Sequence, residues 1–188
     1  MQSLSQLSPG ASPIFLDTSV LINLIAADSI AEMGLALGRP LSVESFVVSE
    51  LRRDPRDGSD PTGLLKQLVA TGALSISTLG EKQMEHFIRL VGAPSPDDLG
   101  DGEAATIVCS LEHGFAAIDE RKALRIVGRD YRKLCVLTTL DLLCSQQAFH
   151  HWGEEEIRKR VMSALQIGRM RVPYSWKPWV EKLTGSVI

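Results

Sequence analysis

Two acidic residues of this 188-residue chain stand directly after short apolar runs. Asp17 follows Ile14–Leu16, and Asp119 follows Phe115–Ile118. Each run is typical of a buried strand. Parallel strands end at the same edge of a sheet, where open α/β proteins bind their ligands. We therefore expect the carboxyl groups of Asp17 and Asp119 to lie at one edge.

Two further acids are placed to reach that edge. Glu50 lies in an apolar segment that favours a helix after a short strand, and Glu103 lies in the first turn of a helix that follows a Gly-Asp-Gly loop. Four carboxylates in one cleft repel each other unless they are protonated or bind a cation. Oxygen ligands without cysteine or histidine select a hard ion, so these residues predict a Mg²⁺ or Mn²⁺ site.

Polar side chains beside these acids are auxiliary candidates. Thr18, Ser19 and Asn23 flank Asp17, and Asp101 lies in the Gly-Asp-Gly loop. The structural alternative is helix capping, because Asp, Ser and Thr are favoured at helix N-termini. We expect Asp101 to act first as the N-cap of its helix and only secondarily as a ligand. For Asp17 the sequence leaves both roles open.

A basic stripe follows Asp119 on a predicted helix. Its arginines recur at i, i+4, i+8 and i+11, at Arg121, Arg125, Arg129 and Arg132, with Lys122 nearby and Asp130 as the only opposing charge. Such a stripe can hold phosphates with a salt-dependent affinity, and a solvated helix face is the alternative. We take Arg121, Lys122, Arg125 and Arg129 as candidate contacts to the phosphates of a nucleic acid.

Strand and helix signals alternate from Ile14 to Phe149. Strands are predicted at 14–16, 41–43, 74–79, 115–119 and 134–138. Helices are predicted at 19–37 (one helix or a pair), 45–51 with Ser45 as N-cap, 63–72, 81–91, 103–114, 120–131 and 141–149. This alternation predicts a three-layer α/β fold, with a parallel central sheet covered by helices on both faces.

Residues 150–188 depart from this alternation. A further helix is predicted at 154–165, and 169–179 is irregular, basic and aromatic. We expect one main domain at 13–149 and a helical C-terminal extension at 150–188 packed on it. Its aromatic residues either stack on unpaired bases beside the basic residues or anchor the extension to the core, and we favour anchoring. The residues concerned are Trp152, Arg158, Lys159, Arg160, Arg169, Arg171, Tyr174, Trp176, Lys177 and Trp179.

Composition narrows the class of protein. A hydrophobic content of 44% and a charged content of 23% are ordinary for a folded domain, and no apolar run reaches membrane-spanning length. Residues 1–13 contain no Lys or Arg, which argues against a secretory signal. The three cysteines are widely spaced, odd in number and set in apolar stretches, which favours a reducing compartment. They form no CxxC pair, which argues against zinc. We therefore expect a cytoplasmic protein that does not enter a membrane.

Four segments resemble the acidic motifs of PIN-domain ribonucleases, the group that includes VapC-type toxins. They are LDTSVLINL, VVSEL, LGDGEAATIVCSLEHG and AAIDERKALRIV, and they cover about residues 13–149. The resemblance implies that Asp17, Glu50, Glu103 and Asp119 bind Mg²⁺ or Mn²⁺ in an endoribonuclease that leaves 5′-phosphate and 3′-hydroxyl ends. It also implies a homodimer and a small antitoxin partner. It says nothing about residues 150–188.

Two other functions remain open from the sequence. The first is a catalytically inactive PIN-like module that binds RNA or another protein. The second is a phosphatase with Asp17 as nucleophile, although Ser19 stands where such enzymes usually carry a second acid.

Overall fold

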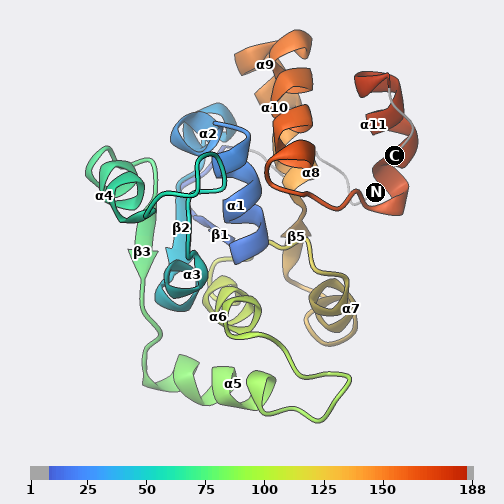
Figure 1. Ribbon diagram of the computed structural model, residues 1–188. Coiled ribbons are helices and arrows are strands. Elements are labelled where there is room, and N and C mark those ends of the chain that lie inside the picture. Colours follow the sequence, from blue (N-terminus) through green and yellow to red (C-terminus); the bar gives the residue numbers. More distant parts are fainter. Residues whose placement is uncertain (1–8, 186–188) are drawn as a thin grey trace.

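The structure, a computed structural model, describes residues 9–185. Five strands form one parallel sheet in the order β3-β2-β1-β4-β5 (Figure 1). Their bounds are β1 Ile14–Leu16, β2 Leu41–Glu44, β3 Ser75–Ser77, β4 Phe115–Ala117 and β5 Cys135–Leu137. In the register of the central strands, Phe15 pairs with Ser42 on one side and with Ala116 on the other.

Helices cover both faces of this sheet. They are α1 Thr18–Ala26, α2 Ile30–Leu37, α3 Ser45–Glu50, α4 Thr62–Ala70, α5 Glu81–Val91, α6 Asp101–Ser110, α7 Arg121–Asp130, α8 Thr139–Leu143, α9 Gln146–Trp152, α10 Glu154–Gln166 and α11 Lys177–Thr184, with a short 3-10 helix, η2 Tyr174–Trp176. The buried core residues of α1, α2 and α10 belong to one layer and those of α5, α6 and α7 to the other. In Figure 1, α2, α9 and α10 lie in the upper part of the view and α5, α6 and α7 in the lower part. The predicted three-layer α/β fold is confirmed, and it fits the PIN-like arrangement.

Strand alternation divides the core into two layers. Leu16 and Val43 belong to the core under α1 and α2, whereas Ala116 and Ile118 belong to the core under α6 and α7. Successive side chains of a strand point to opposite faces, so β4 supplies Ala117 to the first layer and Ala116 to the second. The sheet is therefore covered on both sides, and its ligand-accessible edge is the one where the strands end.

The structure decides one helix prediction and corrects two others. The apolar stretch 19–37 forms a pair of helices, one of the two predicted alternatives, and the chain between them turns at Asp28, whose φ is 48°. The stretch predicted as one helix at 141–149 also forms two, α8 and α9, because Ser145 caps a new helix by accepting a hydrogen bond from the Ala148 N–H at 3.1 Å. Glu44, not Ser45, is the N-cap of α3 and accepts a hydrogen bond from the Phe46 N–H.

The C-terminal extension packs on the layer formed by α1 and α2. Its residues Ile157, Val161, Trp176 and Val180 are buried in the same core as Leu16. Trp176 meets Trp179 edge-on with ring centroids 5.3 Å apart. These two tryptophans therefore anchor the extension, in line with the alternative that the sequence favoured.

The cysteines of the described chain are free thiols. Cys109 and Cys144 are buried and Cys135 is half-buried. Burial raises the pKa of the Cys109 thiol to about 11. Among residues 9–185, no single helix is long and apolar enough to cross a membrane, and α1 with α2 reaches that length and composition only as a pair bent by 103°.

Candidate active site

The candidate site lies at the switch point of the sheet, between β1 and β4. From β1 the chain continues to β2 on one side, and from β4 it continues to β5 on the other. Asp17 directly follows β1, and its N–H donates to the Ala117 carbonyl of β4 at 3.0 Å. Asp119 follows β4 after one residue. Both acids therefore leave the sheet at its carboxyl edge, where diverging connections open a crevice for ligands.

Asp17 is a buried carboxyl group, only 3% exposed. The Ser19 hydroxyl donates to its Oδ2 at 2.6 Å. Burial raises the pKa of Asp17, the bond from Ser19 opposes this, and the negative charge of Glu50 adds to it. Asp17 occupies the N-cap position of α1, but its side chain accepts no capping hydrogen bond. The backbone N–H groups of Thr18 and Ser19 at this helix end nevertheless lower the pKa of Asp17.

Asp119 is held by three hydrogen bonds. Asn23 Nδ2 donates to Oδ2 at 2.8 Å, the Thr139 hydroxyl donates to Oδ2 at 2.6 Å, and the Thr139 N–H donates to Oδ1 at 2.8 Å. Burial raises the pKa of Asp119, and these bonds oppose the rise because they favour the carboxylate. Asn23 is therefore an orienting residue for this acid.

Sequence reasoning missed Thr139. The available signal was its position: it comes shortly after β5, the strand next to β4, so it reaches the same edge as Asp119. Only the order of the strands gives this neighbourhood, because 20 residues separate Thr139 from Asp119 along the chain.

Glu103 projects from the first turn of α6. Its Oε2 accepts a hydrogen bond from the Gly100 N–H at 3.1 Å. Burial raises the pKa of Glu103, the bond from Gly100 opposes this, and the charges of Asp17 and Glu120 raise it further. Glu103 is thus close enough to Asp17 for the two carboxyl groups to repel each other.

Asp101 does not take the capping role expected of it. The N-cap of α6 is Gly100, and Asp101 is the first helical residue, with an exposed side chain. At that position its negative charge favours the helix N-terminus electrostatically.

Glu50 connects three elements. Its Oε2 accepts a hydrogen bond from the Thr18 hydroxyl of α1, and its Oε1 accepts one from the Gly102 N–H of α6 at 2.9 Å. A Cβ on Gly102 would lie 2.5 Å from Glu50 Oε2 and 2.7 Å from Thr18 Oγ1. Glycine at position 102 is therefore what lets α6 begin so close to Glu50, and sequence reasoning missed this requirement.

The donor set suits a hard divalent cation. Asp17, Glu103 and Asp119 supply only oxygen, and within residues 9–185 no Lys or Arg lies within 4.0 Å of their carboxylate oxygens to neutralise them. No three acid, histidine or cysteine side chains of the described chain are placed as a ready-made metal cage. The residues thus fit Mg²⁺ or Mn²⁺ in chemistry and charge, with side-chain adjustment needed to close around an ion.

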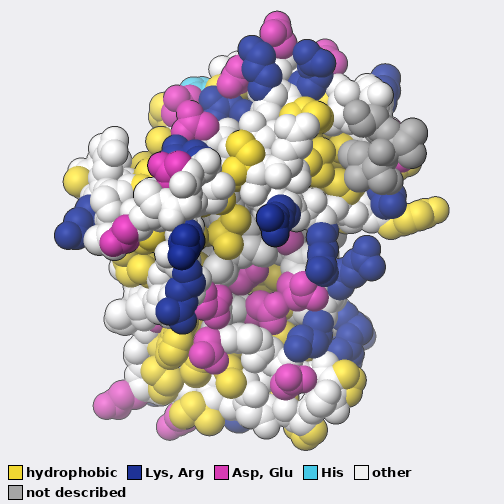
Figure 2. Space-filling model, in the orientation of Figure 1, with side chains coloured by type: hydrophobic (Ala, Val, Ile, Leu, Met, Phe, Trp, Pro, Cys, Tyr) yellow, Lys and Arg dark blue, Asp and Glu magenta, His cyan; other side chains and the backbone are white. Residues whose placement is uncertain are grey.

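Basic side chains surround this acidic region. Figure 2 shows acidic side chains gathered near the middle of this face, with Lys and Arg side chains on several sides of them. Part of the α7 stripe is neutralised. Asp97 accepts from Arg125 at 2.9 Å and from Arg129 at 2.7 Å, and Lys122 lies 3.8 Å from Asp98. The expectation that Asp130 alone opposes the stripe was wrong, because the loop before α6 folds against α7.

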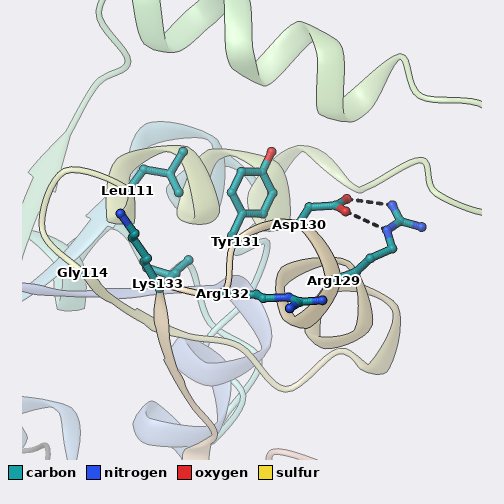
Figure 3. A pocket seen from close by; sticks show the side chains of 8 residues that line it. Leu111, Gly114, Arg129, Asp130, Tyr131, Arg132 and Lys133 are labelled. Carbon is teal, nitrogen blue, oxygen red and sulfur yellow. Dashed lines mark hydrogen bonds and ion pairs between the residues drawn. The ribbon is translucent and has the colours of Figure 1, made fainter.

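A cavity of about 480 Å³ lies away from these acids, at the amino ends of β4 and β5 (Figure 3). Its residues include Leu111, Tyr131, Arg132 and Lys133, and the Asp130 carboxylate beside it is paired with Arg129. It contains none of the candidate site residues except Arg129. This cavity therefore does not coincide with the edge of the sheet where the candidate acids lie.

Comparison of the chain with models of protein families, with curated proteins and with solved structures gave no match. Function is therefore inferred from the chemistry of the residues themselves.

Proposed function

We propose that the protein is a Mg²⁺- or Mn²⁺-dependent endoribonuclease. The observation that carries the proposal is the placement of Asp17 and Asp119 at adjacent strand ends on the switch point of the sheet, with Glu103 near enough to Asp17 for that charge to raise the pKa of Glu103. Burial also raises the pKa of all three carboxyl groups. Carboxyl groups that repel one another, as Asp17 and Glu103 do, are stabilised by a bound divalent cation. The resemblance to PIN-domain ribonucleases supports RNA as the substrate.

In this proposal the four acidic residues have different roles. Asp17 and Glu103 hold the ion, with Asp119 beside them in the orientation that Asn23 and Thr139 give it. Glu50 holds the start of α6, and with it Glu103, against α1. When bound, the ion lowers the pKa of a coordinated water and neutralises charge on the scissile phosphate.

The bond changes follow from the product ends that the resemblance implies. Water attacks phosphorus, the bond from phosphorus to the 3′ oxygen breaks, and that oxygen takes up a proton to become a 3′-hydroxyl. The phosphate stays on the 5′ end of the other fragment. Arg121, at the start of α7, forms no ion pair within residues 9–185 and is the α7 cation that we assign to the RNA phosphates.

The test is cleavage of a mixed-sequence single-stranded RNA with Mn²⁺, with Mg²⁺ and with chelator. We expect metal-dependent cleavage by the natural sequence and a loss of at least about 100-fold in Asp17→Asn, because the substitution removes a ligand charge without changing shape. Glu112→Gln is the matched control. It removes one exposed carboxylate at the opposite edge of the sheet and should cleave normally.

Thermal melting supplies a readout independent of substrate. Saturating Mn²⁺ at about 100 times its dissociation constant should stabilise the natural sequence by about 2.7 kcal/mol and leave Asp17→Asn nearly unchanged. Equal cleavage by Asp17→Asn and the natural sequence would refute the assignment of the reaction to this site, and absence of metal-dependent cleavage by the natural sequence would refute the ribonuclease proposal.

A non-catalytic RNA-binding module is the second candidate. It is favoured by the placement of the acids, since no three of them in the described chain form a ready-made cage and Asp119 already accepts three hydrogen bonds. It predicts RNA binding that is unaffected by Mn²⁺ and no cleavage under any metal condition. A small antitoxin partner, a homodimer and a cytoplasmic location stay predictions from the resemblance and the composition.

A further inference from the structure

The segment after α10 returns to the candidate site. A Cβ on Gly168 would lie 2.6 Å from Asn23 Oδ1 and 2.8 Å from the Ala164 carbonyl. The Met170 N–H donates to that same carbonyl at 3.0 Å. Since Asn23 donates to Asp119, the chain at Gly168 is packed directly against a residue that orients the site.

Two adjoining pockets are built from this segment and the site. One of about 190 Å³ is lined by Asn23, Asp119 and the residues 168–171, among others. The other, of about 370 Å³, is lined by Asp119, Arg121 and the residues 171–174, among others. Asp119, Glu120 and Arg171 line both. The two pockets therefore form one groove that passes over Asp119, with the C-terminal extension as one wall and the start of α7 as the other.

Alternating burial fixes which side chains of this wall face the solvent. Met170 and Val172 are each 7% exposed and belong to the core, whereas Arg169 and Arg171 are exposed. Within residues 9–185 neither arginine forms an ion pair, in contrast to Arg125 and Arg129 of the α7 stripe. The unpaired positive charges beside Asp119 thus come mainly from the extension.

An exposed aromatic ring stands at the outer end of the groove. Tyr174 is 86% exposed, although it lies only two residues before the buried anchor Trp176. The anchor and Pro173 hold the backbone on both sides of this ring, so Tyr174 is presented to solvent from a fixed position. An exposed ring can stack on an unpaired base of a nucleic acid strand, and neighbouring arginines without ion-pair partners can bind its phosphates.

We propose that the segment Gly168–Tyr174 binds single-stranded RNA along this groove, with Arg169 and Arg171 on phosphates and Tyr174 stacked on an unpaired base. The inference rests on the proposed ribonuclease function for its substrate class. An acidic peptide offers carboxylates for the arginines but in general no flat partner for the ring. A single strand offers both groups, whereas a duplex hides its bases from Tyr174.

The test is binding of a fluorescent 12-nucleotide single-stranded RNA in chelator, which separates binding from cleavage. At low salt, Arg169→Gln combined with Arg171→Gln should weaken binding at least tenfold. It should also reduce the slope of log affinity against log salt by about 1.4, since each phosphate contact to a single strand contributes about 0.7. Tyr174→Ala should weaken binding about tenfold, and Tyr174→Phe should restore it because stacking uses the ring.

Lys66→Gln combined with Lys82→Gln is the matched control. It removes two exposed lysines on α4 and α5, neither of which forms an ion pair within the described residues, and should leave binding unchanged. Duplex RNA of the same length should bind more weakly than the single strand and should not respond to Tyr174→Ala.

The outcomes separate this inference from the ribonuclease proposal. Segment-dependent RNA binding without metal-dependent cleavage would support the inference and refute the ribonuclease. Cleavage by the natural sequence, with binding unchanged in the segment variants, would overturn the inference and leave the ribonuclease standing. Absence of RNA binding by the natural sequence, or preferential binding of an acidic peptide, would also overturn the inference.

Discussion

At the scale of single residues, hydrogen-bond partners separate four acids that look alike in the sequence. Asp17 and Asp119 follow the ends of adjacent strands, and the negative charge of Asp17 raises the pKa of Glu103. Glu50 instead binds the Thr18 hydroxyl and the Gly102 N–H. The residue types predicted an acidic site, but partners from distant parts of the chain gave each acid its role.

Gly102→Ala tests the contact between α6 and Glu50. The added Cβ meets Glu50 Oε2 at 2.5 Å, so we expect a loss of about 1–3 kcal/mol in the free energy of unfolding. Gly128→Ala is the matched control. A Cβ at this position in α7 contacts nothing within 4 Å, so helix propensity should make the change neutral or stabilising by up to about 1 kcal/mol.

A double-mutant cycle sharpens this prediction. In a Glu50→Ala background, Gly102→Ala should cost less than in the natural sequence, because the nearest clashing atom is gone. Equal costs in the two backgrounds would contradict the assignment of the strain to Glu50. Urea unfolding measures all four proteins.

Asp54 makes stability depend on pH at the acid end. It is 4% exposed, and its carboxylate accepts hydrogen bonds from Arg56 Nη2 at 2.7 Å and Nε at 3.0 Å. These bonds lower the pKa of Asp54 below its ordinary value of 3.8. As pH falls, the unfolded chain therefore takes up this proton first. The stabilisation is complete above about pH 5 and is lost as pH falls through the folded-state pKa.

Asp54→Asn should accordingly lose about 1–2 kcal/mol at neutral pH, since Arg56 is partly exposed, and much less near pH 2. Asp57→Asn, in the same loop but exposed, should change stability less at neutral pH. Urea midpoints between pH 2 and 7 measure both. Parallel pH profiles for the natural sequence and Asp54→Asn would contradict the role given to this carboxylate.

At the scale of elements, α10 stabilises the end of α1. Arg160 is 9% exposed, and its Nη1 donates to the carbonyls of Ala27 and Asp28 and to Ser29 Oγ at 3.1 Å. Its guanidinium carbon lies 4.3 Å from the centroid of the Trp152 ring. Arg160, predicted only as part of a basic run, is thus a structural cation that joins the extension to the α1–α2 turn.

Arg160→Ala should lower the free energy of unfolding by about 2–3 kcal/mol, because it leaves buried carbonyl groups without a charged donor. Arg160→Lys should recover only part of this loss, since an ammonium group lacks the planar fork that spans several acceptors. Arg158→Ala, an exposed position of the same helix, is the control and should change stability by less than about 0.5 kcal/mol. Equal losses in the Arg158 and Arg160 variants would contradict this assignment.

At the scale of the whole molecule, the extension shares the principal core. Ile157, Val161, Trp176 and Val180 pack with Leu16 and the rest of that core. Each large buried side chain contributes about 1.5–3 kcal/mol, and a whole domain is stable by only about 5–15 kcal/mol. The extension therefore acts as part of the folded unit rather than as an addition to a self-sufficient one.

A chain that ends at residue 149 should show no cooperative thermal transition by circular dichroism. A chain that ends at Gly185 keeps every described helix and strand and should melt as the natural sequence does. A cooperative melt of the 149-residue chain within about 5 °C of the natural sequence would show that residues 13–149 fold alone.

The sequence by itself determined the alternation of strands and helices, the acids at the strand ends and the existence of an extension. These follow from local periodicity and from the rule that parallel strands end together. Tertiary structure alone decided that Asp97 pairs with Arg125 and that Thr139 orients Asp119. It also decided that the backbone at Gly168 packs against Asn23. Each of these is a contact between distant parts of the chain. Local pattern does not encode such contacts, because they depend on strand order and on how loops and helices pack across it.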